Sequence, residues 1–81
     1  MITSGLVVTL SKIPTQARAA IAAIHARAEF TLGELADRWL PLAMEAADEE
    51  ESERLHDWLR GLEGIEFVDV VHVSFDEQVN P

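Results

Sequence analysis

The chain has 81 residues, no cysteine and 48% hydrophobic residues, which is enough for one folded domain over residues 1–81 and too much for a disordered acidic tail. Its net charge is −9. Residues 41–81 hold 12 acidic and 2 basic side chains, whereas residues 1–40 hold 3 acidic and 4 basic ones. A negative field of this kind repels nucleic acid and anionic lipid and attracts cationic partners, so we expect no nucleic-acid partner. Solubility alone accounts for most of the charges.

The start of the chain and its apolar stretches indicate where the protein works. Residues 1–10 lack the basic segment and the cleavage site of a secretory signal. No apolar run approaches the roughly 20 residues that span a bilayer. We therefore expect a cytoplasmic protein without membrane insertion.

The first forty residues predict a strand, a helix and a second strand. Residues 4–10 form the β-branched apolar run that is typical of a strand. Pro14 suits the first turn of a helix, which the alanine-rich residues up to about 26 continue. Apolar side chains recur there at helical spacing on one face, at Ile13, Ala17, Ala20, Ile21 and Ile24. Residues 29–32 predict the second strand.

The second half repeats the pattern. Residues 40–46 predict a strand, residues 48–62 a helix, and residues 65–75 the last strand. Asp48 and Glu51 have the spacing of a capping box at the start of that helix. Pro41 interrupts the third strand, which is central in this arrangement, and proline cannot donate to a ladder. We therefore expect the strand to begin after Pro41 or to contain a bulge there.

The order βαββαβ predicts an α+β, ferredoxin-like sandwich, in which a four-stranded antiparallel sheet carries two helices on one face. Alternation along the strands assigns the side chains to the two faces. Those expected to face the helices are Leu6, Val8, Leu10, Leu40, Leu42, Met44, Val68 and Val70. The last strand is apolar on both faces, so a slip of one residue would reverse its assignment.

The uncovered face of this sheet is the predicted functional surface, because exposed apolar patches usually mark interaction sites. Its candidate binding residues combine apolar side chains with two embedded carboxylates. They are Val7, Thr9, Trp39, Ala43, Glu45, Asp69, Val71 and Val73. A homodimer that buries the same face is the alternative explanation of this surface.

Chemistry-bearing motifs are missing from the sequence. The histidines, at positions 25, 56 and 72, lack the spacing of a metal site, and no glycine-rich phosphate loop or Cys-x-x-Cys pair is present. We therefore expect no catalytic residue, no metal and no cofactor, and a protein that is not an enzyme. A small dimeric enzyme with His72 as its base is an alternative for which no partner residue is evident.

Four short segments resemble the NapD family. Residues 4–8, Ser-Gly-Leu-Val-Val, resemble the strand that begins NapD proteins, and residues 44–48, Met-Glu-Ala-Ala-Asp, resemble the strand that leads into their acidic helix. Residues 59–65 look like the family's Leu-x-x-x-x-Gly-Val passage, and residues 70–72 resemble its closing Leu-Val-Tyr-His. The segment after the first helix departs from the family's Pro-Gly-Val-Glu-Val.

The resemblance implies a ferredoxin-like cytoplasmic chaperone. NapD-like proteins bind the twin-arginine signal peptide of the catalytic subunit of the periplasmic nitrate reductase. They hold back its export until the molybdenum cofactor is inserted. For this chain it implies that Glu45 and Asp69 accept the arginines, while Val7, Trp39 and the valines of the last strand cover the apolar stretch of the peptide.

A second hypothesis is a small-molecule-sensing or dimeric regulatory module, since such modules share this topology. They usually dimerise and hold ligands at interfaces. The sequence offers no clear polar cluster for an amino acid or a nucleotide. We therefore expect a monomer rather than a homodimer, with a twin-arginine signal peptide of a periplasmic nitrate reductase-like molybdoenzyme as its partner.

Overall fold

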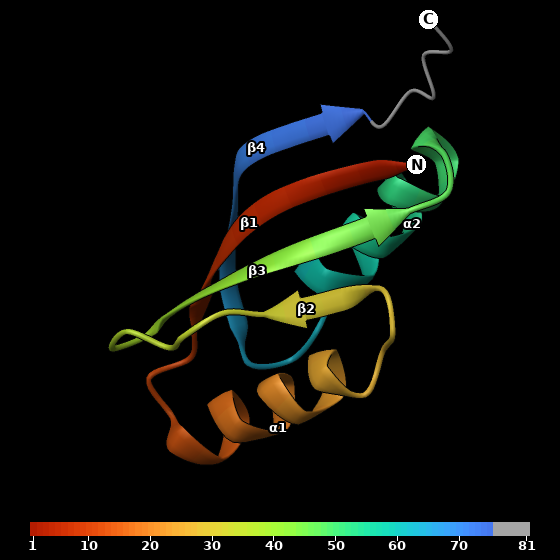
Figure 1. Cartoon of the computed structure of the whole chain (residues 1–81). Coiled ribbons are helices and arrows are strands. Elements are labelled where there is room, and N and C mark those ends of the chain that lie inside the picture. Colours follow the sequence, from red (N-terminus) through yellow and green to blue (C-terminus); the bar gives the residue numbers. More distant parts are fainter. Residues whose placement is uncertain (76–81) are drawn as a thin grey trace, which may run out of the picture.

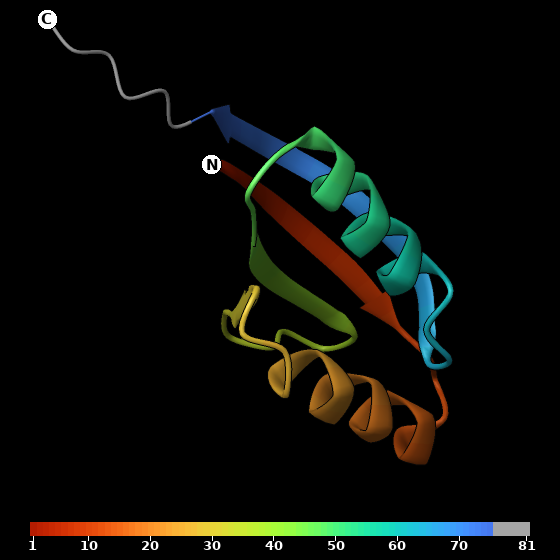
Figure 2. The same cartoon turned by 90° about the vertical axis from the view of Figure 1, so that its right-hand side faces the viewer.

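The computed structural model describes residues 1–75 and contains the predicted ferredoxin-like fold (Figure 1). Its elements are β1 (Ile2–Leu10), α1 (Pro14–His25), β2 (Phe30–Leu32), β3 (Trp39–Ala46), α2 (Glu49–Arg60) and β4 (Ile65–Phe75). The sheet order is β2-β3-β1-β4, and each neighbouring pair is antiparallel. Both helices cover the same face of this sheet and leave the other face open, as Figure 2 shows.

The core lies between the helices and the sheet. Every second residue of β1 is buried from Ile2 to Leu10, and the same alternation runs through β3. The side chains that fill the core include Leu6, Val8, Leu10, Leu40, Leu42 and Met44 from the strands, and Ala20, Ile24, Leu55 and Leu59 from the helices. The inward assignment of these β1 and β3 residues is therefore confirmed.

Helix α2 begins where the sequence predicts. The Glu51 N–H donates to the Asp48 side chain at 2.8 Å, and three glutamates occupy the first turn, where the helix dipole favours negative charge. The helix ends at Arg60, two residues earlier than expected, because Gly61 follows as its C-cap. This end leaves residues 61–64 free to turn the chain into β4.

Strand β3 runs through Pro41 without a break, so both expectations for this position are wrong. Val7 of β1 lies opposite Pro41 in a continuous register from Thr9 to Ile2. The Pro41 carbonyl accepts from the Gly33 N–H at 2.7 Å on the β2 side, so the Pro41 nitrogen faces that side too. Strand β2 has already ended at Leu32 there, and the missing N–H therefore costs no ladder hydrogen bond with β1.

Strand β4 contains a bulge that the sequence analysis missed. Val70 lies opposite Leu6 and His72 lies opposite Gly5, so Val71 is an extra residue in the β1–β4 ladder. The bulge reverses the faces of the residues that follow it. Val73 consequently lies opposite the buried Ser4, on the helix side of the sheet, and its assignment to the open face is wrong.

The turn before β4 provides a test of the fold. Gly64 has a φ of 97°, and a Cβ there would overlap the Gln16 carbonyl oxygen of α1. We expect Gly64→Ala to lower the free energy of unfolding by about 2 kcal/mol, measured by urea denaturation, since strain and steric overlap add. In the control variant Gly61→Ala the new Cβ would lie 3.4 Å from the Asp57 oxygen, and the change should stay below about 1 kcal/mol. Equal losses in the two variants would contradict this role of Gly64.

Candidate functional site

The open face of the sheet carries four rows of side chains, each crossing β3, β1 and β4. The strand register defines them as Trp39–Thr9–Phe67, Pro41–Val7–Asp69, Ala43–Gly5–His72 and Glu45–Thr3–Ser74, with the bulged Val71 beside the third row. Neither helix packs against these rows (Figure 2). The face is therefore available to a partner.

Large apolar side chains are exposed at one end of this face. Trp39 is 49% exposed and Phe67 is 62% exposed, and the two flank Thr9 in the first row. Val71 is 61% exposed two rows further on. Exposed aromatic and aliphatic side chains that share one surface are typical of interaction sites, because covering them removes apolar area from water.

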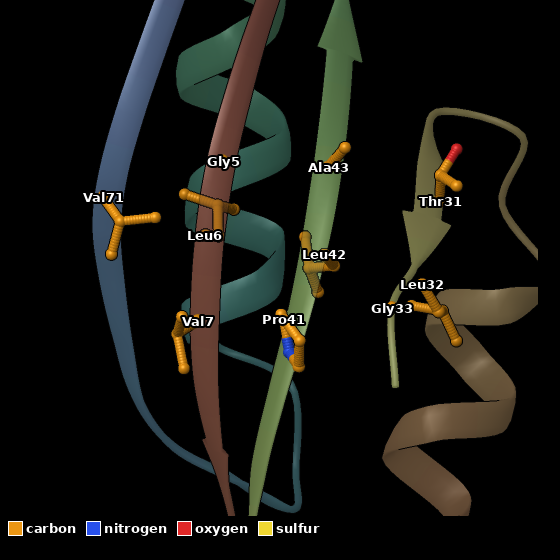
Figure 3. A pocket seen from close by; sticks show the side chains of 10 residues that line it. All are labelled: Gly5, Leu6, Val7, Thr31, Leu32, Gly33, Pro41, Leu42, Ala43 and Val71. Atoms are coloured by element: carbon orange, nitrogen blue, oxygen red, sulfur yellow. The ribbon is translucent and has the colours of Figure 1, made fainter. Parts of the chain in front are cut away.

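A shallow depression of about 360 Å³ crosses the middle of the open face (Figure 3). Its lining comes from all four strands and the loop after β2: Gly5, Leu6, Val7, Thr31, Leu32, Gly33, Pro41, Leu42, Ala43 and Val71. The depression exists because its centre lacks large side chains. Gly5 and Ala43 are paired across β1 and β3, and Gly33 approaches Pro41 so closely that a Cβ would lie 3.0 Å from the Pro41 oxygen.

The two predicted carboxylates lie far apart on this face. Glu45 belongs to the last row and Asp69 to the second, on strands that flank β1. Glu45 and Asp69 are separated by two strand spacings of about 4.8 Å each and by four residues along the strands, each with a rise of about 3.3 Å. Their Cα atoms are therefore about 16 Å apart. Asp69 lies at the β4 edge next to the exposed apolar rows, whereas Glu45 lies at the opposite end of the face.

Seven of the eight predicted site residues share the open face, and Val73 does not. Three of them line the depression, namely Val7, Ala43 and Val71, while Thr9, Trp39, Glu45 and Asp69 lie elsewhere on the face. The prediction omitted Phe67, although alternation with Asp69 already placed it on this face. It also omitted Pro41 and Gly33, whose contribution depends on the loop after β2 returning to the edge of the sheet.

The histidines do not form a metal site in the described residues. His25 ends α1, His56 lies on α2 and His72 lies on the open face. Within residues 1–75, no three histidine, aspartate or glutamate side chains are grouped so that they could hold a metal ion. Neither α1 nor α2 has the length and apolar character needed to cross a membrane.

No protein-family model matches this chain, and no curated protein matches its sequence. What the open face binds is therefore inferred from its geometry, its charge and the segments that resemble NapD.

One ionisable cluster on the helix side is structural. The Arg27 guanidinium lies 4.6 Å from the centre of the Trp58 ring and 3.4 Å from Glu29. The centres of the Trp58 and Phe30 rings are 5.7 Å apart, and the rings are tilted by 33°. Hydrogen bonds from the Glu29 backbone N–H and from Arg27 lower the pKa of the Glu29 carboxyl. These contacts join the turn after α1 to α2 and lie away from the open face.

The histidine on α2, His56, should make the stability of the fold depend on pH. Burial lowers the pKa of His56 below its ordinary 6.5, Arg60 lowers it further, and Asp57 opposes the shift. The unfolded chain then binds more protons than the native one as the pH falls through 6.5, so stability decreases with acidification. We expect His56→Gln to reduce this dependence in urea denaturation on either side of pH 6.5. An unchanged slope in the variant would contradict the assignment to His56.

Proposed function

We propose that this protein is a chaperone that binds the twin-arginine signal peptide of a periplasmic nitrate reductase-like molybdoenzyme on the open face of its sheet. It holds back export until cofactor insertion and folding are complete, and it therefore acts in the cytoplasm. The observation that carries the proposal is the uncovered face, which holds an apolar depression and the exposed Trp39 and Phe67, in a chain of net charge −9.

The chemistry of such a peptide complements this surface. A twin-arginine signal peptide has two adjacent arginines followed by an apolar stretch. The depression and the exposed aromatic row can cover the apolar stretch, and the negative field attracts the arginines. Asp69 lies beside these rows and can accept charge-assisted hydrogen bonds from a guanidinium.

The separation of Glu45 from Asp69 changes the arrangement that the resemblance implies. Glu45 and Asp69 lie on the same face with their Cα atoms about 16 Å apart, whereas adjacent residues of an extended peptide point to opposite faces, so an adjacent arginine pair does not reach both carboxylates. We therefore assign one arginine to Asp69. Glu45 contributes to the general field at the other end of the face.

The resemblance to NapD supports the identity of the partner, and the ferredoxin-like fold agrees with that family's fold. The acidic charge also supports a monomer. Two copies that buried their open faces against each other would each bring a net charge of −9 to the contact, and like charges oppose association. A monomer leaves the face free for the peptide.

The apolar end of the face can be tested by calorimetry with a synthetic nitrate reductase signal peptide. We expect the unmodified protein to bind it with micromolar affinity or better, and Trp39→Ala to weaken binding about tenfold, as the loss of an aromatic anchor does. Ile13→Ala is the matched control, because Ile13 is 51% exposed and lies at the start of α1, away from the open face. Absence of binding, or equal effects of the two substitutions, would refute the proposed site.

A further inference from the structure

A second depression lies on the helix side of the sheet, between α2 and the ends of β1 and β4. It has a volume of about 230 Å³, and we call it the α2–β4 cleft. Its lining residues are Ile2, Ser4, Glu49, Ser52, Glu53, His56, Val70 and Val73. Val70 and Val73 stay 43% and 45% exposed although they face the helix side, so α2 covers them only in part.

A largely buried serine side chain lines this cleft. Ser4 is 4% exposed, the one buried polar side chain in a core that is otherwise apolar over the described residues. Its hydroxyl forms no hydrogen bond with any other residue in the part of the chain that the structure describes. The hydroxyl oxygen is not one of the fully enclosed side-chain atoms that lack a partner, so it is reached from the cleft and can bond a polar group that enters there.

The wall of the cleft is negatively charged. Glu49 and Glu53 lie one turn apart on α2, and neither pairs with a cation among residues 1–75. The nearby arginines are engaged elsewhere on the helix, since Arg54 pairs with Glu50 and Arg60 pairs with Asp57. Burial and Arg60 lower the pKa of His56, which favours the uncharged ring beside the two carboxylates.

Apolar, acidic and hydroxyl surfaces in one cleft match the parts of an arginine side chain. Its methylene stem can pack on Val70 and Val73, while its guanidinium donates to the carboxylates and to the Ser4 hydroxyl. An arginine has five donors in a planar fork, so it can serve several acceptors at once, which a lysine does less well.

We propose that the arginine pair of the bound peptide straddles the edge of β4, with one arginine at Asp69 on the open face and its neighbour in the α2–β4 cleft. Consecutive residues of an extended chain point to opposite faces, and Asp69 and Val70 likewise face opposite sides of β4. In the described sheet β4 pairs only with β1, so its outer edge is free for an extended segment. This inference rests on the proposed function and specifies how the two arginines are divided.

A double-mutant cycle tests the division, with signal peptides in which each arginine in turn is replaced by glutamine. We expect the paired substitution Glu49→Gln and Glu53→Gln to weaken binding of the twin-arginine peptide about tenfold, and Asp69→Asn to do the same. The glutamine pair should have no effect on the peptide that lacks one of the arginines, and Asp69→Asn should have no effect on the peptide that lacks the other. Glu63→Gln, which removes an exposed carboxylate outside the cleft, is the control and should change the affinity less than about twofold.

Coupling of both sites to the same arginine, or no effect of the paired glutamine substitution, would overturn the proposal. A second measurement separates it from the proposed function. Acetyl-Arg-Arg-amide should shift the amide NMR signals of Ser4, Val70 and Val73 in the unmodified protein, and the shifts should disappear in the glutamine pair. If the signal peptide fails to bind while these shifts occur, the proposed function is wrong but the α2–β4 cleft still binds arginine. If the dipeptide causes no such shifts, the cleft assignment fails.

Discussion

Strand β1 lies between β3 and β4, and its side chains point alternately toward the helices and toward the open face. This alternation determines both surfaces of the sheet. Ile2, Leu6 and Leu10 are buried under the helices, and the residues between them must therefore emerge on the other face. In residues 1–75 the two helices cover one side of the four-stranded sheet, and no further helix lies against the second. The open face thus follows from the topology. Its apolar content does not follow from the topology, since Trp39 and Phe67 contribute little to the core from there.

The bulge at Val71 links the open face to the cleft on the other side. Without it, Val73 would lie on the open face, and with it β4 exposes apolar side chains on both faces near one free edge. Free apolar edges invite pairing between copies of a chain, and the net charge of −9 opposes that. The same charge favours a cationic segment along this edge, with carboxylates at Asp69 on one side and at Glu53 on the other.

Local signals in the sequence predicted the elements and most of the core. The alternation of β1, the apolar stripe of α1 and the Asp48 cap each depend on residues close together in the chain, and such patterns can be read directly. The bulge could not be predicted, because both faces of β4 are apolar and alternation alone permits either register. Pro41 was misjudged because the direction of its nitrogen depends on where β2 ends. Both depressions join residues from distant segments, so their shapes required the fold.

We have proposed that the open face of the sheet binds a twin-arginine signal peptide. The most direct measurement is an NMR titration of the isotope-labelled protein with that peptide, followed through its backbone amide signals. We expect shifts along β1, β3 and β4, largest around Gly5, Trp39 and Val71, with the signals of α1 unchanged. Shifts confined to the helices, or no shift at micromolar peptide, would contradict it.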